Sequence, residues 1–138
     1  MVEQRYMLDT NTVSYLIKGV EPAIAGHIKE VPMASLCISS ITEAELLHGV
    51  AKKPEAKKLP TIIKEFLLRV DILPWDSDAA QAYAMLRTAC ENKGRSLGAM
   101  DMLIAAHAYA VNAILITNDK GFCTVAQDLA IEDWTVSR

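Results

Sequence analysis

Short apolar runs alternate with longer amphipathic stretches along this chain. Five of these runs predict β-strands, over residues 6–9, 36–39, 70–73, 114–117 and 129–132. The sequences "CISS" and "ILIT" are brief and partly β-branched, which is typical of strands that are buried on both faces. The pattern therefore predicts strands that lie inside the molecule.

Helical periodicity fills the intervals between these runs. Over residues 59–70, apolar side chains recur at the i, i+3, i+4 and i+7 spacing of an amphipathic helix, with Pro60 at a start or a kink. Further helices are predicted over residues 77–93 and 99–111, and a left-handed Asn112 ends the latter. Strands that alternate with helices predict an α/β fold with a mostly parallel central sheet of about four to five strands, flanked by helices on both faces.

The expected sheet gives two acidic residues a common location. With 138 residues, we expect a single domain over residues 1–138. In open parallel sheets, ligands bind beyond the carboxyl ends of the strands. Asp9 ends the first predicted strand and Asp119 lies just past the fourth, so both are expected at the same edge.

Two further acids come from predicted helices near that edge. The segment "SSITEAELLHG" contains Glu43 and Glu45, and "GAMDMLIAAHA" contains Asp101. Two carboxylates about 4 Å apart repel each other by roughly 4 kcal/mol at an effective dielectric constant near 20. A cluster of such groups is therefore tolerable only with protons or a hard cation, and ligands that are all oxygen favour Mg²⁺ or Mn²⁺ over zinc.

Each of these acids also has a purely structural interpretation. Asp9 could cap the helix that begins near Thr12, Asp101 could stabilise the first turn of its helix, and Asp119 could belong to an ordinary turn. The two glutamates are not separated by spacing alone, because Ser40 to Glu43 and Thr42 to Glu45 both fit a capping box.

Composition excludes several classes of protein. Fourteen Lys and Arg against seventeen Asp and Glu give a net charge of −3, so any contact with nucleic acid must rest on local clusters, at residues 52–58 and 93–95. Three widely spaced cysteines without a CxxC pattern argue against disulfides or zinc and fit the cytoplasm. We expect neither a signal peptide nor a membrane span.

Four segments in series resemble those of the PIN-domain ribonucleases, specifically the VapC toxins of bacterial VapBC toxin–antitoxin pairs: "MLDTN", "ISSITEAELLHG", "GAMDMLIAAHA" and "ILITNDKGF". The sequence "IEDW" at residues 131–134 is similar to the end of the enterobacterial members. The resemblance covers essentially the whole chain and implies a PIN domain over residues 1–138. It is also the main reason to prefer Glu45 over Glu43.

The resemblance implies a Mg²⁺- or Mn²⁺-dependent endoribonuclease that stops translation by cutting RNA, with tRNA, and initiator tRNA in particular, as the leading target. The catalytic and metal-binding acids of the family fall on Asp9, Glu45, Asp101 and Asp119. Its small polar supporting residues fall on Asn11, Ser40, Thr117 and Asn118. Hydrolysis by water activated at a metal predicts 5′-phosphate and 3′-hydroxyl ends.

The resemblance also implies partners. A VapB-type antitoxin would lay its C-terminal tail along a partly apolar groove, for which the helices around residues 12–19 and 43–67 are the candidate walls, and would send a basic side chain among the acids. A homodimer is expected, although nothing in the sequence fixes its face. The RNA backbone on either side of the site would contact four basic residues, Lys52, Lys53, Lys93 and Arg95.

Two other functions fit parts of the sequence. A phosphotransferase of the haloacid dehalogenase type would use Asp9 as a covalent nucleophile, but it needs a second Asp where this chain has Asn11. A PIN-fold module that only binds a partner or RNA is the other alternative. An intact acidic set argues against it, because losing acids would relieve repulsion at no functional cost.

Overall fold

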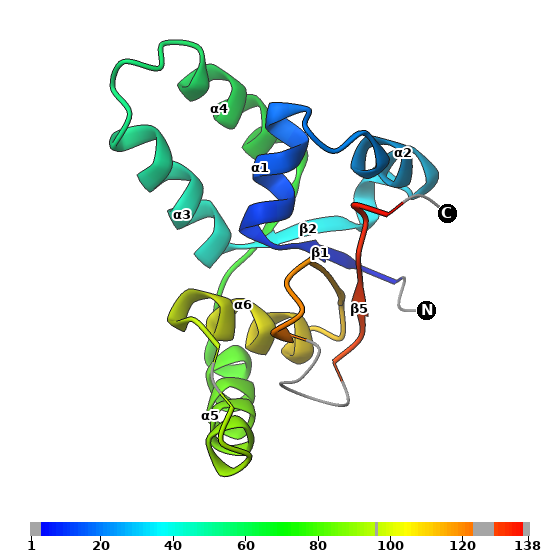
Figure 1. The fold of residues 1–138 in the computed structure, drawn as a ribbon, viewed down its shortest axis with the longest axis vertical. Coiled ribbons are helices and arrows are strands. Elements are labelled where there is room, and N and C mark those ends of the chain that lie inside the picture. Colours follow the sequence, from blue (N-terminus) through cyan, green and yellow to red (C-terminus); the bar gives the residue numbers. More distant parts are fainter. Residues whose placement is uncertain (1–3, 96, 123–128, 137–138) are drawn as a thin grey trace.

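A computed structural model of the chain describes residues 4–95, 97–122 and 129–136. Its centre is a five-stranded sheet in which every pair of neighbouring strands is parallel (Figure 1). The strands lie in the order β3-β2-β1-β4-β5 and comprise β1 (Tyr6–Leu8), β2 (Leu36–Ser39), β3 (Asp71–Leu73), β4 (Ile114–Ile116) and β5 (Ile131–Glu132). The prediction of an α/β fold with a parallel central sheet is confirmed.

Six α-helices cover this sheet in the described part of the chain: α1 (Thr10–Lys18), α2 (Pro22–Glu30), α3 (Ser40–Ala51), α4 (Leu59–Arg69), α5 (Ser77–Asn92) and α6 (Ala99–Ala110). A short 3₁₀ turn, Met33–Ser35, leads into β2. The helices α4, α5 and α6 were predicted, and Asn112 has the expected positive φ of 57°. The sequence did not predict α2, and residues 52–58 separate α3 from α4 within the stretch that we expected to be helical.

Several predicted strands are shorter in the structure. Val70 ends α4, because its N–H donates to the carbonyl of Phe66 at 3.1 Å, so β3 begins at Asp71. Asp9 and Thr117 each lie just past their strands, and the predicted strand over residues 129–132 is reduced to β5. These differences are small, but they move both Asp9 and Thr117 from the sheet to its edge.

Alternating side chains give the sheet two apolar faces. Leu8, Ile38 and Ile116 point to one face, where they pack with residues from α1 to α4. Their neighbours Met7 and Leu115 point to the other face and pack against α6, as the two-residue period of a strand requires. Figure 1 shows this division, with α1 to α4 on one side of the strands and α5 and α6 on the other.

An aromatic cluster connects the start of the chain with the segment after β5. Trp134 is 1% exposed and stacks on His27 of α2, with ring centroids 5.3 Å apart and planes at 5°. The ring of Tyr6 in β1 also packs against Trp134, at 5.4 Å. The Nε2 atom of His27 lies 2.7 Å from the carbonyl oxygen of Val136, so the segment after β5 holds α2 in place.

Two other predictions concern membrane spans and the cysteines, and the structure tests them only for the described residues. No helix within the described residues is both long and apolar enough to cross a membrane. Cys37 is buried in β2, and this burial raises the pKa of its thiol to about 12. Cys123 lies outside the described residues.

Candidate active site

The strand order places a crevice at the carboxyl end of the sheet. The chain builds β1, β2 and β3 outwards in one direction and then crosses to β4 on the other side of β1. Ligands of α/β proteins bind where the order of strands reverses in this way. Asp9 follows β1 and Asp119 follows β4, so both lie beside this switch point.

Asp9 is both a helix cap and a buried acid of this crevice. Its Oδ1 accepts a hydrogen bond of 2.8 Å from the N–H of Thr12, which caps α1. The residue is only 2% exposed, and this burial raises the pKa of its carboxyl, although hydrogen bonds from Thr117 and Thr12 oppose the rise. The structural and functional interpretations of Asp9 are therefore compatible.

Asp101 shows that the four predicted acids share one electrostatic environment. It lies in the first turn of α6, as expected, after Gly98 at the N-cap. Its pKa is raised chiefly by burial, and then by the negative charges of three other residues, Asp119, Asp9 and Glu45. Segments of the chain that are far apart in sequence thus converge on one negatively charged region.

The structure separates the two glutamates by a contact of Glu45 and not by the start of α3. Ser39, not Ser40, is the N-cap, and its Oγ accepts a hydrogen bond of 3.1 Å from the N–H of Ile41. Both predicted capping boxes, from Ser40 to Glu43 and from Thr42 to Glu45, are therefore wrong. Glu45 instead faces α1, where its Oε1 accepts a hydrogen bond of 2.5 Å from the hydroxyl of Thr10.

Asp119 is held by the turn that contains it. Its N–H donates to the Oγ1 of Thr117 at 3.1 Å, and its Oδ1 accepts from the N–H of Gly121 at 2.8 Å. A Cβ added at Gly121 would lie 3.1 Å from this Oδ1, closer than an ordinary contact. The predicted turn chemistry is present, and it fixes the direction of the carboxylate.

The predicted supporting residues differ in their positions. Thr117 is buried and hydrogen-bonds to Asp9, so it lies inside the site. Ser40 accepts a hydrogen bond of 3.0 Å from the N–H of Trp75, and so it connects α3 to the segment before α5 rather than contacting an acid. Asn11 is exposed and Asn118 is half-buried, and neither forms a described hydrogen bond to the four acids.

Three residues that orient the site were not predicted from the sequence. Thr10 holds Glu45, Gly121 holds Asp119, and His107 lies 2.7 Å from the Oγ of Ser39, the cap of α3. The two ends of the first contact are 35 residues apart, and those of the third are 68 apart. Only the turn sequence "NDKG" offered a local signal, and it pointed to Gly121.

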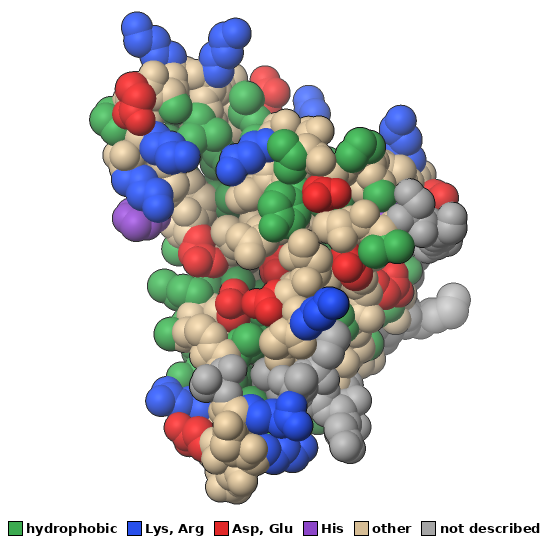
Figure 2. All heavy atoms as spheres, in the orientation of Figure 1, with side chains coloured by type: hydrophobic (Ala, Val, Ile, Leu, Met, Phe, Trp, Pro, Cys, Tyr) green, Lys and Arg blue, Asp and Glu red, His purple; other side chains and the backbone are tan. Residues whose placement is uncertain are grey.

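The donor set of this region suits a hard divalent cation. All four carboxylates and the hydroxyl of Thr117 offer oxygen, the ligand that Mg²⁺ and Mn²⁺ prefer. Figure 2 shows acidic side chains near the middle of this face, between basic side chains over α3 and α4 above and over α5 below. Within residues 4–95, 97–122 and 129–136, however, no three Asp, Glu, His or Cys side chains are already arranged around one metal position.

Comparisons with known proteins agree with this architecture. The sequence matches the PIN domain family over residues 6–128. It is 32% identical to a tRNA(fMet)-specific endonuclease VapC of Shigella flexneri, over 95% of this chain and 98% of that protein. It is 35% identical to a ribonuclease VapC2 of Rickettsia felis, over 94% and 97% of the two chains.

Two solved VapBC structures have a similar fold. VapBC of Salmonella typhimurium, solved with DNA, superposes with a TM-score of 0.88 at 31% identity, over 96% of this chain and 99% of that chain. VapBC2 of Rickettsia felis, bound to a DNA fragment from its promoter, gives 0.86 at 34% identity, over 95% and 99%. Sequence and fold agree over nearly the full length, and the chain belongs to the VapC ribonucleases of the PIN-domain family.

Proposed function

We propose that this VapC ribonuclease is a Mg²⁺- or Mn²⁺-dependent toxin that cuts tRNA in the cytoplasm, with initiator tRNA as its target. One observation carries the metal dependence: besides burial, the negative charges of Asp119, Asp9 and Glu45 raise the pKa of the Asp101 carboxyl. These charges oppose folding in the absence of a cation, so their presence needs a function. The choice of tRNA rests on the relative from Shigella flexneri.

The protein's own contribution is to hold four acids and to keep their orientation. The N–H of Thr12 holds Asp9, the hydroxyl of Thr10 holds Glu45, and the N–H of Gly121 holds Asp119. Asp101 lies in the first turn of α6, whose N-terminus favours the ionised carboxylate. When an RNA phosphate enters the crevice, these groups define the side from which water attacks it.

A bound divalent cation would supply activation of water and neutralisation of the charge that develops on the phosphate. Asp9, Asp101, Glu45 and Asp119 are the residues that would hold it. Because water and not the ribose 2′-hydroxyl is then the nucleophile, the products carry 5′-phosphate and 3′-hydroxyl ends. The phosphotransferase alternative is set aside by the family to which the chain belongs.

A VapB-type antitoxin is the proposed inhibitor, since the similar structures are VapBC complexes. A basic side chain of such a partner would pair with the same carboxylates that otherwise attract a cation. We also propose that the toxin is a homodimer.

The test is cleavage of total RNA in the presence of Mn²⁺ by the wild type and by Asp9→Asn, followed by sequencing of new 5′ ends. The expected result is a small set of 5′-phosphate ends in initiator tRNA that disappears with the variant. Unchanged cutting by Asp9→Asn would overturn the site, and cyclic phosphate ends would overturn the mechanism. A wild type that cuts nothing but still binds its antitoxin would support the non-catalytic alternative.

A further inference from the structure

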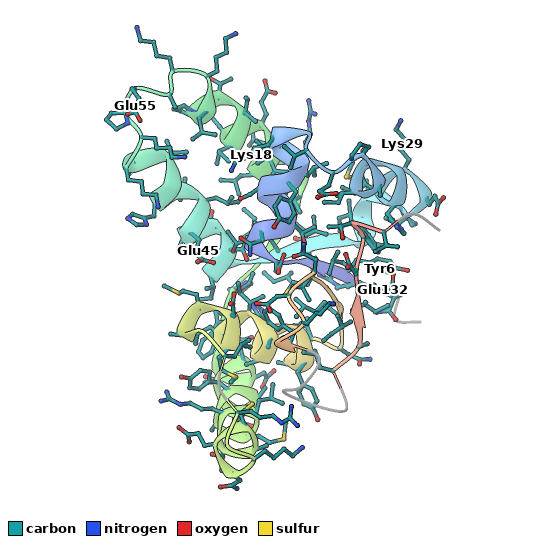
Figure 3. The ribbon with its side chains drawn as sticks, in the orientation of Figure 1. Tyr6, Lys18, Lys29, Glu45, Glu55 and Glu132 are labelled. Atoms are coloured by element: carbon teal, nitrogen blue, oxygen red, sulfur yellow. The ribbon has the colours of Figure 1, made fainter. Side chains whose placement is uncertain are left out.

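A cavity of about 320 Å³ adjoins the acidic site between α1, α3 and α4. Thr10 and Glu45, which are joined by their hydrogen bond, form the end of the cavity nearest the acids. Figure 3 shows Glu45 at the end of α3 nearest the sheet, with Lys18 above it on α1. The volume of the cavity is at the lower end of the range of about 300–1,000 Å³ for small-molecule sites.

The cavity has an apolar floor and a basic rim. Its floor includes Ile17, Leu46 and Ile63, of which the last two are almost completely buried. Its rim carries three lysines, Lys18, Lys52 and Lys53, at the C-terminal ends of α1 and α3. Such positions favour cations in any helix, but none of these lysines forms an ion pair within the described residues.

Gly49 provides a second observation at the same place. It lies in the interior of α3 and lines the cavity, yet a Cβ added there would meet nothing within 4 Å. Gly in a helix interior costs about 0.8–1.0 kcal/mol relative to Ala, and packing gives no reason for it here. Close approach of the backbone to a ligand is one of the uses of glycine, and Gly49 leaves the wall of the cavity open to such an approach.

We propose that this cavity binds one unstacked nucleotide of the RNA, immediately beside the phosphate that is cut. The base lies on the apolar floor against Gly49, and the phosphates next to it contact Lys52 and Lys53. Sequence-specific recognition of RNA usually takes bases from single-stranded loops and inserts them into such pockets. The inference rests on the proposed ribonuclease function and adds a subsite for substrate to it.

The location of the cavity favours substrate over another ligand. Any strand whose phosphate reaches the acids must continue in both directions from that point, and this cavity begins at Glu45 itself. Three lysines match the charge of an RNA backbone, and the uncharged floor suits a base. The helices around residues 12–19 and 43–67, which we expected to form the antitoxin groove, also line this cavity, so the test must separate RNA from the antitoxin tail.

The decisive variant is Gly49→Leu, which adds a bulky side chain to the wall of the cavity at a position where a Cβ meets nothing within 4 Å. The matched control is Gly26→Leu, because Gly26 is also inside a helix, is exposed, and has open space around an added Cβ. Both changes favour helix formation, so neither should unfold the protein. With bulk tRNA and Mn²⁺ under single-turnover conditions, we expect Gly49→Leu to raise the half-saturating protein concentration about tenfold, and Gly26→Leu to leave it unchanged.

A charge test addresses the rim independently. Lys52→Gln with Lys53→Gln is compared with Lys29→Gln with Lys64→Gln, an equal change of charge at exposed positions that do not line the cavity. Figure 3 shows Lys29 on α2, well away from α3. Binding of bulk tRNA is measured against salt in an Asp101→Asn background. The quantity compared is the slope of the logarithm of the binding constant against the logarithm of the salt concentration. Lys52→Gln with Lys53→Gln should make this slope shallower by about 0.7 for each phosphate that a lysine no longer neutralises. The control pair should change the slope less.

The outcomes separate the subsite from the function on which it rests. If the wild type cuts tRNA and Gly49→Leu cuts it with the same half-saturation, the subsite is overturned while the ribonuclease stands. If Gly49→Leu abolishes only antitoxin binding, the cavity belongs to the partner and the proposal fails. If the wild type cuts no RNA, the proposed function itself is wrong.

Discussion

The two ends of the central sheet treat charge in opposite ways. At the amino end, Asp71 at the start of β3 pairs with Arg5 before β1, with 3.0 Å between Nη1 and Oδ2. At the carboxyl end, four acids share one region, and no ion pair within the described residues neutralises any of them. The same sheet therefore carries a compensated acid at one end and an uncompensated group at the other.

This difference separates a structural arrangement from a functional one. An exposed ion pair such as Arg5 with Asp71 contributes about 0.2–1 kcal/mol to stability and needs no ligand to neutralise it. Repulsion among the acids at the carboxyl end lowers stability, which is typical of sites that trade stability for activity, and the proposed cation would relieve it. Substitutions at both ends, and at the groups that orient the acids, test whether the two ends differ in this way.

The widest difference is expected between Asp101→Asn and Asp71→Asn. Mutation of a residue that only hydrogen-bonds to a metal ligand typically reduces activity by roughly 10–100-fold. Asp101→Asn should reduce cleavage of tRNA by more than this, whereas Asp71→Asn should leave cleavage intact. Without divalent cations the two variants should change stability with opposite signs, because Asp101→Asn removes repulsion and Asp71→Asn removes an attraction. Cleavage assays and urea unfolding in a chelator measure the two effects.

Manganese provides a second measurement of the same difference. Adding Mn²⁺ should raise the melting temperature of the wild type and of Asp71→Asn, and it should raise that of Asp101→Asn much less, since only the native state binds the ion. Equal shifts in all three proteins would remove the distinction between the two ends of the sheet.

A middle effect is expected for Gly121→Ala. The added methyl group would lie 3.1 Å from Oδ1 of Asp119 and 3.3 Å from Leu97, so the carboxylate must move by a few tenths of an ångström. Small misplacements of catalytic groups are costly, and we expect a fall in kcat of roughly three- to tenfold, a fraction of the loss from a shift of about 1 Å. Gly26→Ala, which meets open space, is the control. Unchanged kcat would mean that the orientation of Asp119 does not matter.

A weaker effect, on the pH dependence of stability, is expected from His107, a buried and uncharged side chain near the carboxyl end of the sheet. Burial lowers its pKa, and Asp76 opposes this change. Since the unfolded chain takes up the proton first, the contribution of His107 to stability is complete above about pH 6.5 and is lost as the pH falls through the lower native value. His107→Asn can keep a hydrogen bond to Ser39 but cannot become charged.

The measurement is the difference in unfolding free energy between this variant and the wild type from about pH 7.5 to about pH 5, an interval that spans the ordinary pKa of histidine. The carboxylates are the same in both proteins, so their own pH dependence largely cancels. We expect the wild type to lose stability relative to the variant as the pH falls. A constant difference would show that folding does not change the pKa of His107.

Local patterns were sufficient for most of the architecture. The apolar runs located β1, β2 and β4, and the rule that ligands bind at the carboxyl ends of parallel strands was enough to select Asp9 and Asp119. The helix α2 escaped prediction, because Pro22–Glu30 is short and mixes Ala and Gly with few apolar side chains. It is held by Trp134 and by the backbone at Val136, which no local pattern can reveal.

The orientation of the site could not be predicted in the same way. Two capping boxes of equal quality left Glu43 and Glu45 undecided by spacing, and in the structure Ser39 caps α3, so neither box forms. The contact of Thr10 with Glu45 joins two helices that meet only in the folded chain. Local sequence therefore identifies the acids that are available for a site. Contacts between distant segments determine the direction in which these side chains point.

The stacking of Trp134 on His27 has a consequence for synthesis on the ribosome. Val136 and His27 are 109 positions apart, so α2 lacks its support until nearly all of these residues have been translated. Asp119 and β4 also appear late, after the helices that carry Glu45 and Asp101. A nascent polypeptide emerging from the exit tunnel thus has no assembled acidic crevice until β4 and Asp119 have been translated.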